Sequence, residues 1–250
     1  PEYQQQTNHL RIARVLFASF DDTLPGELRD EHLFEWVDQY NRGWKQLNDD
    51  ERITVSKLNL EAAAKAQRTI ALDSALYYAD WGLRILLNHE NTNIISDQQW
   101  QMHQVLLFAL LSCQAECAGL KSDPNKAEQL FGMLSKQAQT LPEQIQLTII
   151  QTNVFEFQGQ YKKAIDALVS GLQRLGLALP LKLQDQQQLL KGYLDKLPVN
   201  LDQLDAEHLL HQAPVTNPQQ QMLMKLLMRL WTPCYITGKL ELLSLVSIEL

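Results

Sequence analysis

The chain has 250 residues, of which 45% are hydrophobic and 20% are charged, as in ordinary globular proteins. Its formal net charge of -7 argues against binding to nucleic acid or to an acidic membrane surface, because such binding relies on clustered Lys and Arg. The longest uninterrupted apolar run, residues 105–111, is shorter than the roughly 20 residues of a membrane-spanning helix. We therefore expect no membrane insertion and no nucleic-acid partner.

The cysteines indicate a reducing compartment. Cys113, Cys117 and Cys234 leave one thiol unpaired in any intramolecular disulfide scheme, which favours the cytoplasm. The chain also starts at Pro1 and stops inside an apolar helical pattern, so we expect it to be a piece of a longer protein.

Helical periodicity predicts two opening helices, at residues 10–20 and 33–44. A helical hairpin follows, from 51–68 and 73–87, with Asp73 as the N-cap of its second helix. A polar loop at 88–96 leads to a long helix at 97–119, and Asp123 and Pro124 are typical of the N-cap and first residue of a partner helix that ends at 138.

Two further helices are predicted at 143–158 and 161–176, and they form a third hairpin. Leu179, Pro180 and the polar residues 184–188 indicate an irregular crossing, followed by short helices up to Pro218. The last long helices are expected at 218–230 and 239–250. No segment has the alternating, β-branched pattern of a strand, so the chain is predicted to be all-α.

Small and aromatic residues recur at similar offsets in these hairpins. Gly159, Tyr161, Ala164, Leu168 and Gly171 are separated by two, three, four and three residues, and parts of this pattern return elsewhere. Glycine relaxes the backbone where two helices meet, and alanine lets a neighbouring helix approach closely. The structural repeat positions are Ala75, Gly82, Ala127, Phe131, Gly159, Tyr161, Ala164, Gly171 and Gly238.

These offsets resemble the tetratricopeptide repeat. The key alanines are 52 and 37 residues apart, however, whereas the regular repeat has a period of about 34 residues. We therefore predict stacked antiparallel helical hairpins that form a tetratricopeptide-like, right-handed α-solenoid with irregular repeats.

A broader resemblance covers nearly the whole chain. The segments "NHLRIARVLFAS", "EHLFEWVDQYNRG", "LNLEAAAKAQRTIALDSALYYADWGLRIL", "QGQYKKAIDALVSGLQRLGLALP" and "WTPCYITGKLELLSLV" follow one another as in very large bacterial signalling proteins. The proteins that the chain resembles carry an ATPase of the AAA or STAND type, often after a serine/threonine kinase-like domain. A tetratricopeptide-like region follows in them, and then commonly a GAF domain and a histidine kinase.

The resemblance implies three parts. Residues 1–47 would be the helical tail of an upstream ATPase or winged-helix module, residues 48–180 the helical hairpins, and residues 181–250 an irregular continuation. It brings no catalytic residue to this chain, which contains neither a Gly-x-x-x-x-Gly-Lys-Ser/Thr phosphate loop nor a histidine-kinase phosphoacceptor box. We assign no catalytic, cofactor-binding or metal-binding residue and expect no cofactor.

Two groups of residues could hold a metal, and packing is the favoured alternative for the first. Cys113 and Cys117 lie one helical turn apart, but no second pair of ligands accompanies them. His208 and His211 beside Glu207 do not follow the order His-Glu-x-x-His or its inverse, so solvated or capping histidines are favoured.

Aromatic and acidic residues also have two interpretations each. The five tryptophans, Trp36, Trp44, Trp81, Trp100 and Trp231, could line a peptide-binding groove, but packing between helices is favoured. The acidic pairs Asp21–Asp22 and Asp49–Asp50 lie at predicted helix ends, where carboxylates stabilise a helix N-terminus.

The first function hypothesis is a non-catalytic scaffold that binds a protein partner or neighbouring domains of its own chain inside a large signalling ATPase-kinase. The alternative is the inducer-sensing repeat region of a STAND-type transcription activator. A small metal-dependent enzyme built on His208, His211 and the cysteines is a third hypothesis. The oligomeric state is left open.

Overall fold

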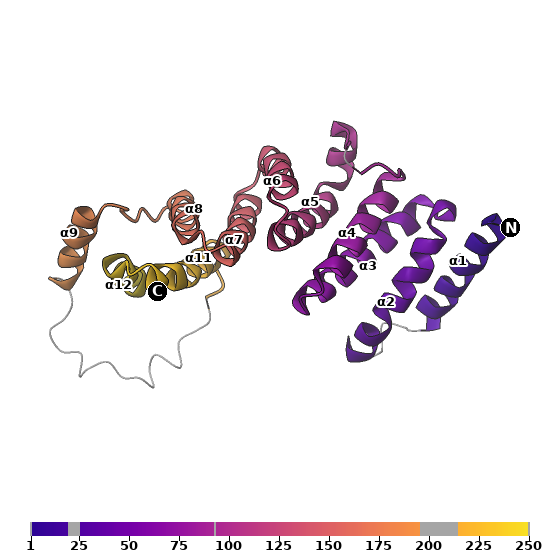
Figure 1. The fold of residues 1–250 in the computed structure, drawn as a ribbon, viewed down its shortest axis with the longest axis horizontal. Helices are drawn as coiled ribbons and strands as arrows, with labels where there is room; N and C mark the ends of the chain where they lie inside the picture. The colour runs from indigo at the N-terminus through magenta and orange to yellow at the C-terminus, as the bar shows by residue number, and fades with distance from the viewer. Residues whose placement is uncertain (1, 20–25, 93, 196–214, 250) are drawn as a thin grey trace. The chain divides into compact units, whose positions relative to one another are not determined.

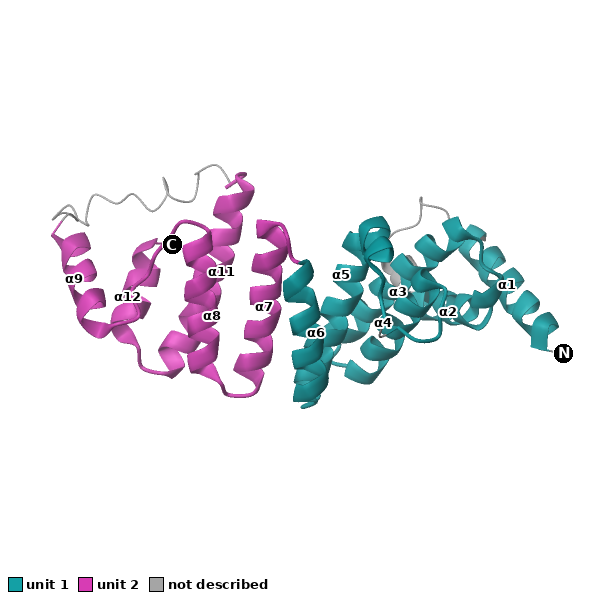
Figure 2. Cartoon of the chain, turned by 90° about the horizontal axis from the view of Figure 1, so that it is seen from above, with its two compact units in different colours: residues 1–137 teal, residues 138–250 magenta. Residues whose placement is uncertain are grey.

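The computed structural model describes residues 2–19, 26–92, 94–195 and 215–249, and every regular element in these ranges is a helix. The predicted all-α class of stacked helical hairpins is therefore confirmed. The chain divides into two compact units, residues 1–137 and 138–250 (Figures 1 and 2). No helix in the described ranges combines the length and the apolar character needed to cross a bilayer.

Unit 1 is a series of helices packed on their neighbours in the chain (Figure 1). Each of the pairs α1–α2, α3–α4 and α5–α6 packs together, α2 packs on α3, and α4 packs on α5. The elements are α1 (Glu2–Ser19), α2 (Gly26–Arg42), the short 3-10 helix η1 (Trp44–Gln46), α3 (Asp49–Arg68), α4 (Leu72–Leu87), α5 (Asp97–Leu120) and α6 (Pro124–Gln137).

The first helices of unit 1 share one hydrophobic core with those that follow. Leu10 of α1, Val37 of α2 and Trp44 of η1 are buried in the same cluster as Leu58 of α3 and Tyr78 of α4. The domain boundaries inferred from the resemblance, after residues 47 and 180, stay a prediction.

Unit 2 departs from chain order (Figure 2, magenta). Its elements are α7 (Leu141–Phe157), α8 (Tyr161–Arg174), α9 (Leu183–Leu194), α11 (Pro218–Ile236) and α12 (Leu240–Glu249). Helix α11 packs on α8, α12 packs on α11, and α9 packs on α12. Gln187 Nε2 donates to Glu241 Oε1 at 3.2 Å, and the Tyr193 hydroxyl donates to Glu249 Oε1.

Four helix–helix turns have the same backbone geometry. Ile70, Ser122, Gly159 and Gly238 each have a φ of 60° to 69° and precede α4, α6, α8 and α12 by two residues. In each turn the next N–H donates to the carbonyl five residues back, for example Gln160 to Phe155 at 2.7 Å and Lys239 to Cys234 at 2.9 Å. This is the Schellman arrangement, which ends a helix with a left-handed residue.

The first helix of each of three pairs starts with a capping box. Asn48 with Glu51, Ser96 with Gln99 and Thr140 with Glu143 each bond reciprocally between side chain and backbone N–H. Local residues thus define the start and the turn of these hairpins: a polar cap begins the first helix, and a left-handed residue turns the chain between the two helices.

Three predictions about element bounds were wrong. Ala71, and not Asp73, is the N-cap of α4, because the left-handed Ile70 starts the helix earlier; Asp73 lies in the first turn, where it pairs with Lys121. Residues 184–188 are helical within α9 rather than an irregular crossing, since Gln and Leu are good helix formers.

The third correction concerns α11, which continues past Leu230 to Ile236 with Pro233 inside it. Pro233 has no N–H to donate to the carbonyl of Arg229. Pro233 and Cys234 are buried, and this packing of the last turn offsets the missing hydrogen bond. The short helices predicted before Pro218, with Pro198 and Pro214, lie outside the described residues.

Candidate interaction surface

Four of the five tryptophans are buried or half-buried within unit 1, as the packing interpretation predicts. Trp36, Trp44 and Trp100 are buried, and Trp81 is half-buried with its ring edge-on to Trp44 at 6.3 Å. Trp231, in unit 2, is different because 43% of it is exposed. It is therefore the tryptophan available for contact with another molecule.

Trp231 belongs to an exposed line of large side chains along α11, which we call the α11 stripe and define as Met228, Trp231 and Tyr235. Their spacing of three and four residues places them on one helical face. The rings of Trp231 and Tyr235 are stacked, with centroids 5.7 Å apart and planes 9° apart. Met228 and Tyr235 are each 64% exposed.

The opposite face of α11 explains why the stripe points outward. Leu226, Leu227, Leu230 and Cys234 are fully buried in the core of unit 2, where α11 packs on α8. Because α11 already buries that face in the core, the α11 stripe remains exposed to solvent. Burial of each of its large apolar side chains against another molecule would stabilise the contact by about 1.5–3 kcal/mol.

The charges near the stripe are mixed. Lys225, one turn before Met228, is exposed. Arg229, on the turn between them, lies near Glu156 of α7, and burial raises the pKa of that carboxyl while Arg229 lowers it. The stripe thus combines apolar and aromatic surface with a lysine at its edge, a composition typical of protein contact sites.

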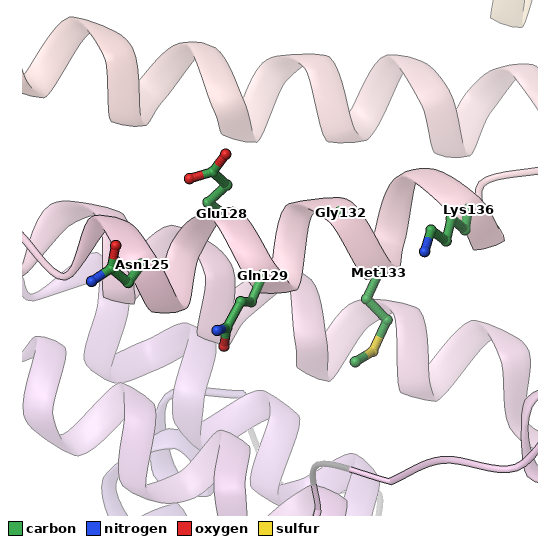
Figure 3. A pocket seen from close by; sticks show the side chains of 6 residues that line it. All are labelled: Asn125, Glu128, Gln129, Gly132, Met133 and Lys136. Carbon is green, nitrogen blue, oxygen red and sulfur yellow. The ribbon is translucent and has the colours of Figure 1, made fainter.

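A hollow of about 620 Å³ lies along one face of α6 (Figure 3). Gly132 lies at its middle, and a Cβ added there would meet no atom within 4 Å. The residues that line it are Asn125, Glu128, Gln129, Gly132, Met133 and Lys136. This face mixes polar and apolar surface, and it offers no cluster of groups suited to catalysis.

The structural repeat positions lie at helix crossings and turns. Ala75, Ala127 and Ala164 are buried in the first turns of α4, α6 and α8. Gly82 and Gly171 lie against side chains of neighbouring helices, and Gly159 and Gly238 form two of the left-handed turns. Phe131 and Tyr161 are half-buried. Their assignment to a tetratricopeptide pattern stays a prediction.

The thiols are buried and free of disulfides. Burial raises the pKa of Cys234 to about 11. Donation of a hydrogen bond by the Cys113 thiol to Cys117, together with burial, raises the pKa of Cys113. Cys113 and Cys117 are therefore buried core residues, as the packing interpretation predicts. In the described ranges, no three His, Cys, Asp or Glu side chains gather as metal ligands would. His208, His211 and the pair Asp21–Asp22 lie outside those ranges.

Sequence reasoning did not find the α11 stripe as a unit. Met228 was within the predicted helix, but that helix was expected to end at Leu230 and so to exclude Trp231 and Tyr235. The signal was nonetheless in the sequence: an apolar and aromatic line with spacing 228, 231 and 235, on the face opposite Leu226, Leu227 and Leu230.

Comparison with known proteins gives one distant relation. The chain is 23% identical over 186 residues to "Hybrid signal transduction histidine kinase G" of Dictyostelium discoideum. The similarity covers 70% of this chain and only 5% of that protein. No known family matches the chain, and no solved structure matches it. The distant similarity is to a signalling protein.

Proposed function

We propose that this chain is a non-catalytic helical-repeat scaffold that makes protein–protein or interdomain contacts and relays a signal within a large ATPase-kinase. The observation that carries the proposal is the exposed, stacked pair Trp231–Tyr235 on a helix whose other face is buried. Exposed aromatic side chains in a well-held position are the residues that dominate the energy of protein contacts.

The distant similarity to a signal-transduction histidine kinase supports a signalling context. The chain spans about 5% of that relative, so catalytic activity belongs, in this proposal, to other parts of a longer protein. The ATPase, the serine/threonine kinase-like domain, the bacterial origin and the cytoplasmic location remain parts of the proposal. The alternative, an inducer-sensing region of a transcription activator, requires a DNA-binding domain encoded beside it.

Site-specific photo-crosslinking tests the contact surface. A photoreactive amino acid replaces Thr232, which is exposed next to Trp231, in the full-length protein. The matched control carries it at Lys162, which is exposed on α8. We expect a defined crosslinked peptide from position 232 and none from position 162.

The double variant W231A/Y235A then separates specific contact from chance proximity. Loss of a contact-dominating aromatic side chain costs about 2 kcal/mol or more, which corresponds to roughly 30-fold weaker binding. The crosslink at position 232 is expected to disappear in this variant. Equal crosslinking from both positions, or tight ATP binding by the isolated chain, would refute the proposal.

A further inference from the structure

Unit 1 contains a polar pocket that the scaffold function does not use. Its volume is about 470 Å³, within the range of small-molecule sites. One wall comes from α4 and the loop that follows it, with Asp80 and Glu90. The other wall comes from α6, with Lys126 and Met133, and α5 contributes Leu111 and Gln114 between them.

Gln114 is the first reason to treat this pocket as a site. It is only 5% exposed, and its side-chain amide has no hydrogen-bond partner among the described residues. The amide atoms are not sealed from the space of the pocket, so a molecule that enters it can form hydrogen bonds with them. A ligand in the pocket would provide the missing partner.

The charges of the lining narrow the chemistry of that ligand. Asp80 Oδ2 accepts from Arg84 Nη2 at 3.1 Å, and Glu90 Oε1 lies 3.4 Å from Lys45 Nζ. Lys126, on the opposite wall, has no ion-pair partner among the described residues. A simple anion would approach two carboxylates, and a simple cation would approach Lys126. A zwitterion carries one charge of each sign, so it can pair with the carboxylates of one wall and with Lys126 on the other.

The apolar part of the lining fits a small side chain. Leu111 is buried, and Met133 is half-buried beside it on α6. Gln129 and Met133 line this pocket and Glu128 does not. Figure 3, a view of the neighbouring hollow, shows Gln129 and Met133 projecting from α6 on the side opposite Glu128. Methionine adapts to apolar groups of different shape.

We propose that this pocket binds a free α-amino acid. The carboxylate faces Lys126, the ammonium group faces Asp80 and Glu90, the side chain contacts Met133, and the Gln114 amide bonds to a polar group of the ligand. The proposal goes beyond the scaffold function and does not depend on the α11 stripe, which lies in unit 2.

Thermal-shift and calorimetric titrations with each of the twenty L-α-amino acids test the proposal on the whole chain. We expect at least one amino acid to raise the melting temperature, because a ligand that binds the folded state stabilises it. Its α-carboxamide derivative, which lacks the carboxylate charge, is expected to bind roughly 10-fold more weakly.

Two variants with matched controls identify the site. Gln114→Met keeps the side-chain volume but removes the amide, and Gln101→Met makes the same change at an exposed position of α5. Lys126→Met removes the facing charge, and Lys136→Met is its exposed control on α6. We expect each pocket variant to lose affinity by roughly 10-fold or more, and each control to bind as the parent protein does.

The stability of the ligand-free Gln114→Met variant separates binding from folding. Since the amide has no partner in the free protein, its removal should leave the melting temperature unchanged or raise it. A structural role would lower it. The proposal is overturned if none of the twenty amino acids shifts the melting temperature, or if Gln114→Met and Lys126→Met bind with the parental Kd.

Discussion

Gly82 tests the packing on which the helical hairpins depend. It lies on α4, where a Cβ would meet Leu110 Cδ2 of α5 at 2.6 Å and Asn59 Cβ of α3 at 3.2 Å. Leu110 is fully buried and Asn59 is held by hydrogen bonds to Asn41 and Val55, so neither neighbour can move freely. Gly82→Ala should therefore overpack the point where three helices meet.

The expected magnitude follows from two opposing effects. Overpacking a well-packed core costs about 1–3 kcal/mol, whereas replacing a mid-helix glycine by alanine stabilises the helix by about 1 kcal/mol. Gly82→Ala should thus destabilise unit 1 by up to about 2 kcal/mol. Gly132→Ala, on α6 with open space around its Cβ, should instead stabilise it by up to about 1 kcal/mol.

Both glycines belong to unit 1, so urea unfolding followed by far-UV circular dichroism and tryptophan fluorescence compares them in one transition. The helix-propensity effect cancels between the two variants, and their difference measures the overpacking alone. If Gly82→Ala unfolds at the same urea concentration as Gly132→Ala, the result contradicts the close approach of α3, α4 and α5 at Gly82.

Three further predictions concern turns, crossings and pH. Ile70→Gly should stabilise unit 1 by about 1 kcal/mol in urea unfolding, since Ile70 has a φ of 60° and is 79% exposed. Gly159→Ala, at a φ of 69°, should destabilise unit 2. Changes in stability of the opposite sign would contradict the turn geometry. Ala164→Glu should abolish cooperative unfolding of unit 2 or lower its stability by more than about 3 kcal/mol, because Ala164 is fully buried. A melting curve identical to that of the parent protein would contradict the burial of Ala164. The hydrogen bond from Arg14 lowers the pKa of Glu51, so this carboxylate stabilises the fold above its unfolded pKa of about 4.3 and ceases to do so as the pH falls through its lower folded pKa. The stability difference between the parent and Glu51→Gln should therefore be present at neutral pH and vanish in acid, and a difference that grows in acid would contradict the ion pair.

Local sequence signals were sufficient for most helix bounds. The long helix after the polar loop at 88–96 and the pair of helices around Gly159 occur where the periodicity predicts them. Capping and turn residues act within a few positions of themselves, so their effect can be deduced without knowledge of the tertiary fold. Where a turn used Ile70 in place of glycine, the same reasoning placed the N-cap of α4 incorrectly.

The candidate sites depended on more distant contacts. The exposure of Trp231 follows from which face of α11 packs on α8, and the continuation of that helix past Pro233 depends on burial of its last turn. The polar pocket joins residues that are up to 53 positions apart, from Asp80 to Met133. No periodicity within one helix indicates that Gln114 faces this pocket.

The sequence by itself determined that this protein is built of helices, where most of them begin and end, and that small residues recur where they meet, because propensity, capping and turn conformation are local properties of the chain. Only the tertiary structure decided that α9 packs on α12, that three tryptophans are buried while Trp231 is exposed, and that Gln114 faces a pocket. The physical reason is that burial and partner choice depend on which surfaces meet, and these surfaces come from residues far apart along the chain.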